Sequence, residues 1–261
     1  MARKASRKTT RPPASATTPA APSPRIPLLD MARGSAIALM VGFHFCFDLN
    51  FFHLASFDFY RDPFWLNLRA FIVTLFLLIV GISFHLANGN GFRARPFLRR
   101  LGVLACCAAA VSVGSYVIFP ASGIFFGVLH FIALASVLGL LFLPLHHANL
   151  VLGIAAIAAG LSLENAWFDQ PWMSWIGFTT HKPISEDYVP LFPWFGVVLL
   201  GLYLGKTLSI RGIWKKLADW QPGSAPARLL CKAGKHSLAI YILHQPALLG
   251  ILYIASKLKG A

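Results

Sequence analysis

Long apolar runs are the feature that most constrains this chain. Most of them reach the roughly 17 to 25 residues that a helix needs to cross the hydrocarbon core of a bilayer. With 57% hydrophobic and 12% charged residues among 261, the chain is too apolar for an ordinary soluble domain. The sequence therefore predicts an all-α, polytopic transmembrane bundle of about seven spans. The seven runs cover residues 34–52, 65–87, 98–119, 124–145, 149–164, 191–205 and 237–256.

The fifth and sixth runs are the least regular. Residues 149–164 are short and rich in Ala and Gly, and residues 191–205 carry Pro193 near their start. Short, tilted and partly re-entrant helices are all compatible with such runs. The number of spans therefore depends on these two segments.

Positive charge is concentrated in alternate connections. Lys and Arg cluster in residues 1–25, 88–100 and 206–236, whereas residues 53–64, 119–123 and 165–190 hold few of them. Cytoplasmic loops of membrane proteins carry an excess of Lys and Arg. This pattern predicts an N-terminus inside and a C-terminus outside, with Lys257 and Lys259 as mild counter-evidence.

The basic N-terminal segment is distinct from the rest of the chain. Residues 1–25 are rich in Pro, Ala, Ser and Thr, and they contain Lys and Arg but no acid. Such a composition predicts a disordered basic arm, followed by one transmembrane domain over residues 26–261. No signal-peptidase site follows the first apolar run, so we expect that run to remain as a helix. A transit peptide is the alternative, although no amphipathic face is visible.

The net charge is +14, but the placement of the basic residues and the spacing of the four cysteines argue against nucleic acid and metal as partners. The basic residues lie in blocks without interleaved aromatic residues or a known DNA- or RNA-binding module, so we expect no nucleic acid. The cysteines have no CxxC spacing, so neither a disulfide framework nor a metal site is predicted. The bilayer is the expected partner, and the sequence leaves the oligomeric state open, a homo-oligomer included.

Ionisable residues inside the apolar runs are the candidate site. His44 and Asp48 lie one turn apart on one face of the first run, in its outer half, and Arg69 and His130 fall at a similar depth in two other runs. A charge at that depth costs about 2.5–3.5 kcal/mol on insertion scales and normally faces a cavity or a partner. The set therefore indicates a functional cavity, and an interhelical hydrogen bond is the structural alternative for any single histidine.

Several segments together resemble a known family. "LLDMARGSAIALMVGFHFCFDLNFF", "LFLLIVGISFHLA", "GVLHFIALASVLGLLF", "LFPWFGVVLLGLYLG" and "GKHSLAIYILHQP" are similar to successive motifs of bacterial membrane proteins related to the heparan-α-glucosaminide N-acetyltransferase catalytic domain. The resemblance runs from about Arg25 to Leu249, and the opening motif with Asp30 and Arg33 is the most specific. It implies a multi-pass enzyme of the bacterial inner membrane, which moves acetyl from cytoplasmic acetyl-CoA to an amino sugar or another cell-envelope glycan outside.

The resemblance also implies candidate residues, with departures from the family pattern. The histidine just after the first helix has its nearest match in His53 of "FHLASF", while His44 takes the position of an asparagine in the eukaryotic relatives. The second helix lacks the Asp and Pro of those relatives and offers Arg69 instead, and His130 replaces a glutamine. Neutral histidine suits a general base near pH 7, and Asp48 could orient His44 or His130. Asp48 could equally be a charge partner, and acyl-histidine and direct transfer both remain open.

Two further groups complete the interpretation. The phosphates of acetyl-CoA require cations on the inner side, where plain membrane anchoring is the alternative role for the arginines. The candidates are Arg33, Arg95, Arg99 and Arg100. Trp172 and Trp175 could stack on a sugar or form an interfacial aromatic belt. A transporter or proton pathway using the buried His and Asp is the competing function, weakened by the lack of an internal repeat.

Overall fold

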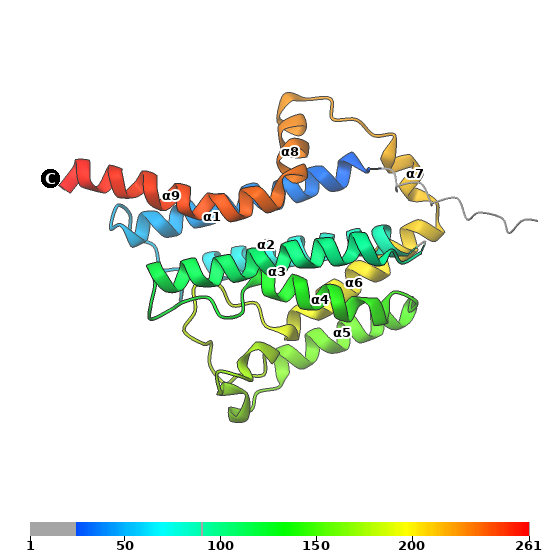
Figure 1. Ribbon diagram of the computed structural model, residues 1–261, viewed down its shortest axis with the longest axis horizontal. Helices are drawn as coiled ribbons and strands as arrows, with labels where there is room; N and C mark the ends of the chain where they lie inside the picture. Colours follow the sequence, from blue (N-terminus) through cyan, green and yellow to red (C-terminus); the bar gives the residue numbers. More distant parts are fainter. Residues whose placement is uncertain (1–24, 90, 261) are drawn as a thin grey trace, which may run out of the picture.

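The computed structural model describes residues 25–89 and 91–260, and over these residues the protein is all-helical (Figure 1). The expected basic arm lies, apart from Arg25, outside the described residues. Each apolar run of the sequence corresponds to one helix, and short helices occupy the connections. The helices are α1 (Pro27–Phe51), α2 (Pro63–Asn88), α3 (Ala94–Ile118), α4 (Val128–Phe142), α5 (His147–Ser162), η1 (Ala166–Asp169), η2 (Ser174–Ile176), α6 (Leu191–Ile210), α7 (Ile213–Ala218), α8 (Ala225–Lys235) and α9 (Ser237–Gly260).

Five of these helices are long and apolar enough to cross a membrane, namely α1, α2, α3, α6 and α9. The helices α4 and α5 are shorter, with 15 and 16 residues. The fourth apolar run is longer than α4 because its first residues lie in a loop that pairs with another loop. Val189 N–H donates to Phe126 C=O at 3.3 Å, and just before the run Glu186 N–H donates to Ser122 C=O at 3.0 Å. Pro144 follows the end of α4, where a proline disfavours further helix.

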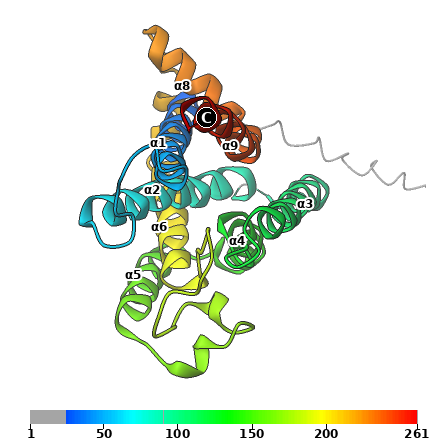
Figure 2. The same cartoon turned by 90° about the vertical axis from the view of Figure 1, so that its left-hand side faces the viewer.

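Figure 2, which looks along the helices, shows how they are layered. The helices α1 and α9 lie at the top with α8, α2 and α3 lie below them, α4 and α6 come next, and α5 lies at the bottom. Buried apolar side chains of α2, α4 and α6 form the core, among them Leu77, Phe131 and Leu202. The helices α1 and α9 pack against each other, and Leu238, Tyr241 and Ile242 of α9 also contact that core.

Pairs of glycines set three of the helix crossings. A methyl group on Gly34 of α1 would collide with the backbone of α8, and one on Gly81 of α2 would collide with α6. Gly153 of α5 and Gly196 of α6 meet in the same way. Small residues that let backbones touch are the usual packing device between helices in membranes.

The basic linker 206–236 is more ordered than the sequence analysis anticipated. It contains α7 and α8, and Ser224 caps α8 by accepting the Ala227 N–H at 3.3 Å. The backbones of α8 and α1 meet at the Gly34 contact, so α8 rests against the first turns of α1.

Candidate functional site

A polar cluster lies where α1 faces α9. The His44 and His244 rings are 5.0 Å apart between centroids, and Gln245 Nε2 donates to Asp48 Oδ1 at 2.7 Å. Asp48 is only 1% exposed. The structure thus gives Asp48 a hydrogen bond from Gln245 rather than from His44 or His130, so its expected orienting role would act through α9.

The hydrogen bonds of His244 define its tautomer. Its Nδ1 lies 2.7 Å from the Tyr241 carbonyl oxygen, which can only accept, so Nδ1 carries the hydrogen. In the neutral imidazole, Nε2 is then an acceptor. Within the described residues, Nε2 has no hydrogen-bond partner, and neither do Asp48 Oδ2 and Gln245 Oε1.

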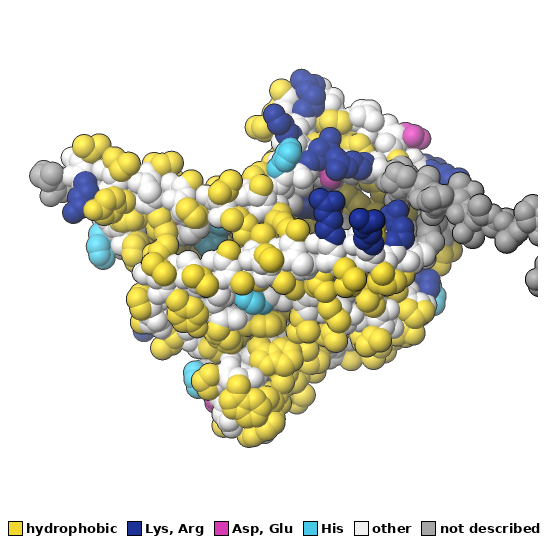
Figure 3. Space-filling model, viewed as in Figure 1, with side chains coloured by type: hydrophobic (Ala, Val, Ile, Leu, Met, Phe, Trp, Pro, Cys, Tyr) yellow, Lys and Arg dark blue, Asp and Glu magenta, His cyan; other side chains and the backbone are white. Residues whose placement is uncertain are grey.

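These three unpartnered atoms have one chemical property in common. A carboxylate oxygen, an amide oxygen and an unprotonated ring nitrogen are all acceptors. Buried polar atoms without a partner are rare in folded proteins, and each is explained by a bound water, ion or ligand or by a functional role. The α1–α9 cluster is therefore suited to a group that donates several hydrogen bonds. Figure 3 shows a hollow between the layer of α1 and α9 and that of α2 and α3, with histidine visible inside it.

His130 lies in a second cluster at the start of α4. Its Nδ1 accepts the Gly127 N–H at 3.3 Å, and its Nε2 lies 3.2 Å from Ser112 Oγ on α3. Ser112 in turn donates to Ile124 C=O at 2.6 Å. The hydrogen bonds of His130 therefore join α3, α4 and the preceding loop, and none of those described reaches α1 or α9.

Asp187 connects the two clusters, and the sequence analysis missed this role. Its Oδ2 accepts from Val128 N–H at 2.8 Å and from the Tyr241 hydroxyl of α9 at 3.2 Å. Burial raises the pKa of Asp187, against the opposing effect of these hydrogen bonds. In the sequence, Asp187 is only one acidic residue of the outer connection 165–190, and its two hydrogen-bond donors lie on other helices.

The remaining outer candidates are more exposed. His53 is exposed in the turn after α1, with a left-handed φ of 56°. Arg69 is exposed near the start of α2, and partial loss of hydration together with the Arg69 cation lowers the pKa of Lys182 in the long loop. Trp172 is exposed, and its indole N–H donates to Gln170 Oε1 at 2.8 Å. Trp175 is half-buried and packs against Phe126, 5.8 Å between ring centroids.

The arginine candidates lie at the opposite end of the molecule. Figure 3 shows Lys and Arg side chains gathered there on both sides of the gap between α8 and α3. Arg33 donates to Asp30 at 2.9 Å and to Ser83 of α2 at 2.8 Å, so an acid already partners its charge. The α3 arginines are exposed instead: Arg95, Arg99 and Arg100.

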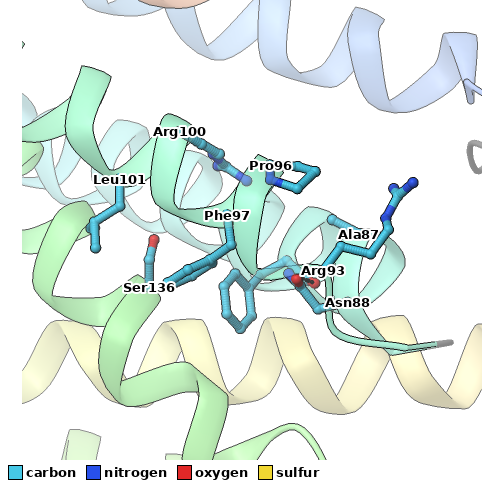
Figure 4. Close-up of a pocket in the computed structure, with 9 residues that line it drawn as sticks. Ala87, Asn88, Arg93, Pro96, Phe97, Arg100, Leu101 and Ser136 are labelled. Carbon is cyan, nitrogen blue, oxygen red and sulfur yellow. Dashed lines mark hydrogen bonds between the residues drawn. The ribbon is translucent and has the colours of Figure 1, made fainter.

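A small cavity of about 120 Å³ lies beside the α3 arginines, between α2, α3 and α4. Phe84, Phe97 and Ser136 line it, and Arg93 and Arg100 stand at its rim (Figure 4). In Figure 4 both guanidinium groups point away from Ser136. These cations are thus directed outward rather than held in the cavity.

The described residues contain no group of three or more His, Cys, Asp and Glu side chains placed to hold a metal ion. The family described as "Heparan-alpha-glucosaminide N-acetyltransferase, catalytic" matches residues 25–246. That range includes both polar clusters and the arginines of α1 and α3. No curated protein and no solved structure matches the chain.

Proposed function

Because the chain belongs to the heparan-alpha-glucosaminide N-acetyltransferase catalytic family, we propose that it is a multi-pass membrane acetyltransferase. It takes acetyl from acetyl-CoA at the basic end of the bundle and transfers it to an amino sugar or other cell-envelope glycan from the opposite side. The observation that carries this proposal is the α1–α9 cluster, where the half-buried His44 and His244 face each other and three buried acceptor atoms have no partner among the described residues.

The basic end fits the nucleotide part of the donor. Phosphates form strong charge-assisted hydrogen bonds with guanidinium groups. Arg95, Arg99 and Arg100 would hold these phosphates, because they are exposed and Arg33 already has Asp30 as a partner. Arg33 would add to the positive potential of this end. Eleven residues of α1 separate Arg33 from His44, which is about 16 Å at the rise of an α-helix. Acetyl-CoA supplies the activated acetyl thioester, which an extended arm would present at that depth.

The α1–α9 cluster fits an amine acceptor better than a hydroxyl. An ammonium group has three N–H donors, matching Asp48 Oδ2, Gln245 Oε1 and His244 Nε2, whereas a hydroxyl has one. His44 or His244 would take the proton that the amine loses as the nitrogen bonds to the acetyl carbon. The carbon–sulfur bond breaks, and the imidazolium returns the proton to the sulfur. The ammonium releases one proton to solvent before the attack, which gives the neutral amine that acts as the nucleophile, so the products are the amide, the free thiol and that one proton.

His130, His53, Arg69 and the tryptophans take supporting parts in this proposal. His130 is occupied in holding α3 and α4 together, which favours a structural role for it. His53, Arg69, Trp172 and Trp175 would meet the acceptor at the outer mouth, where the tryptophan rings can stack on a sugar. His53 remains the other candidate for the base.

Charge distribution supports an N-terminus on the cytoplasmic side of a bacterial inner membrane. Lys and Arg gather at the end where α1 and α3 begin, as the positive-inside rule requires. Seven crossings need α4 and α5 to span as well. The Lys206 ammonium donates to Pro144 C=O at 2.7 Å, so the α4–α5 turn lies beside the basic end of α6. This contact favours crossing over a re-entrant hairpin.

The test is incubation of the purified protein in lipid nanodiscs with labelled acetyl-CoA and a panel of amino sugars and envelope glycans. We expect label on free amines and none on the N-acetylated versions of the same sugars. Label on the N-acetylated controls would point to hydroxyl acceptors. No transfer to any acceptor, with proton uptake in proteoliposomes, would favour the transport alternative.

A further inference from the structure

Two loops at the outer end of the core are paired with each other. Besides the two backbone hydrogen bonds at Glu186 and Val189, the Ser122 hydroxyl donates to Glu186 Oε1 at 2.5 Å, and Ser185 Oγ donates to Gly123 C=O at 3.4 Å. Residues 122–128 and 185–189 therefore form one connected unit. This unit holds Asp187 at the start of α4.

Asp187 lies at a point where the backbone must come close. A methyl group on Gly127 would collide with Asp187 Oδ2, so a side chain there would displace the carboxylate from its present position. The same oxygen accepts from the first N–H of α4, at Val128, where a carboxylate interacts favourably with the helix dipole. Its second donor is the Tyr241 hydroxyl. Asp187 thus joins the paired loops and α4 to α9.

The helix α9 has few such connections. Within the described residues, its side-chain hydrogen bonds to other elements are those of Gln245 to Asp48 and of Tyr241 to Asp187. Tyr241 also contacts His244 twice: its carbonyl oxygen receives the His244 Nδ1 hydrogen at 2.7 Å, and the two rings are 5.8 Å apart. The position of Tyr241 therefore fixes the position of His244.

We propose that Asp187 is a positioning residue, which holds Tyr241 and through it keeps the His244 ring against His44. The proposal rests on the acetyltransferase function proposed above and adds to it a contact between the outer loop and the α1–α9 cluster. Displacing a reacting group by about 1 Å can cost up to about 100-fold in rate. The acceptor oxygen of residue 187 is the required feature, since two donors converge on it.

Three variants separate this role from a general effect of charge. Asp187→Ala removes the acceptor, and Tyr241→Phe removes the donor while keeping the ring. Asp187→Asn keeps an acceptor oxygen and loses the charge. We expect the first two to lower kcat by up to about 100-fold with an unchanged KM for acetyl-CoA. Asp187→Asn should retain most of the activity. The double variant Asp187→Ala with Tyr241→Phe should be no worse than either single variant.

The matched control is Asp169→Ala in the same long loop, where the carboxylate accepts from Thr180 and makes no contact with α9. A second measurement, independent of activity, is hydrogen exchange of the α9 amides in residues 237–250. Exchange should become faster in Asp187→Ala and Tyr241→Phe, and stay at the wild-type rate in Asp169→Ala. If Asp187→Ala fails to fold, Tyr241→Phe decides alone, because it removes one oxygen only.

The outcomes distinguish this inference from the proposed function. Wild-type kcat and wild-type α9 exchange in Tyr241→Phe would overturn the positioning role, and so would additive losses in the double variant. If the wild-type protein transfers acetyl to no acceptor while Tyr241→Phe still loosens α9, the contact is supported and the proposed function fails.

Discussion

Gln245 on α9 donates a hydrogen bond of 2.7 Å to Asp48 on α1, across 197 residues of sequence. The bond occupies one oxygen of a fully buried carboxylate and leaves the other without a partner among the described residues. The amide oxygen of Gln245 is also buried without a partner among the described residues. The two helices thus build one acceptor-rich surface, to which neither contributes enough alone.

The first prediction concerns the base. His44→Ala should lower acetyl transfer by about 10² to 10⁴-fold, the usual contribution of a general base. Binding of acetyl-CoA, measured by titration calorimetry, should be unchanged. His53→Ala is the matched comparison, because His53 is exposed beyond the end of α1. If His53→Ala abolishes transfer and His44→Ala does not, His53 is the base and His44 has only a packing role.

The second prediction concerns Asp48 and Gln245. Asp48→Asn should lower transfer to amines while the protein still expresses and binds acetyl-CoA. The substitution replaces a carboxylate by an amide, whose oxygen is a weaker acceptor and whose nitrogen is a donor. Gln245→Leu should have a similar effect, and the two changes together should be clearly non-additive, since they share one hydrogen bond. Initial rates with a single amino sugar measure all three. Additive effects would show that the two residues act independently.

Much of the architecture could be predicted from the sequence, because it follows from local patterns. Apolar runs predicted the helices, and the i, i+4 spacing of His44 and Asp48 predicted one shared face of α1, which in the structure lies toward α9. The shortness of α4 could not be read in this way. It depends on hydrogen bonds between residues 122–126 and 186–189, which lie more than 60 positions apart.

The candidate site likewise depends on contacts between residues that lie far apart in the sequence. His244 and Gln245 lie in the last apolar run, and only the packing of α9 on α1 brings them to His44 and Asp48. Asp187 gave no sequence signal beyond its charge, because its importance comes from two donors on different helices. Arg33 was a candidate for binding the phosphates of acetyl-CoA, and its pairing with Asp30 in the structure could not be read from the cationic pattern alone.

The third prediction concerns the donor. Arg99→Ala with Arg100→Ala should weaken acetyl-CoA binding, and the loss should shrink at high salt because phosphate contacts are screened. The matched control is Lys215→Ala with Lys216→Ala, which removes two positive charges from α7 in the other basic linker, 206–236. Titration calorimetry in detergent measures both. Equal losses in the two double variants would mean that general positive potential attracts the donor.

The fourth prediction concerns pH and stability. Burial raises the pKa of Asp187 above its ordinary value of 3.8. The folded state therefore holds this proton more tightly than the unfolded state does, and the resulting stabilisation is complete below about pH 4. It is lost as pH rises through the raised, folded value. The Tm of the wild type minus that of Asp187→Asn should therefore decrease as pH increases from 4.

Asp169 provides a control of opposite sign. The Thr180 hydroxyl lowers the pKa of Asp169, so its stabilisation is present above the unfolded pKa and is lost as pH falls through the folded value. The Tm of the wild type minus that of Asp169→Asn should therefore increase as pH increases. Parallel curves for the two variants would contradict the assignment of Asp187 as the acid with the raised pKa.

The fifth prediction concerns topology and the two short helices. Reporters fused near Arg95 and Lys215 should read cytoplasmic, and one near Asp169 should read external. These positions do not distinguish a crossing α4–α5 pair from a re-entrant one, because both return the chain to the same side. A label at the turn between α4 and α5 does distinguish the two arrangements.

Ala148 is exposed beside this turn, close to the contact between Lys206 and Pro144. In a variant with the four native cysteines replaced, Ala148→Cys should resist a membrane-impermeant maleimide in intact cells and react after permeabilisation. Labelling from outside would mean that α4 and α5 do not cross, which would reduce the count to five spans and leave the α4–α5 turn within reach of the outer side.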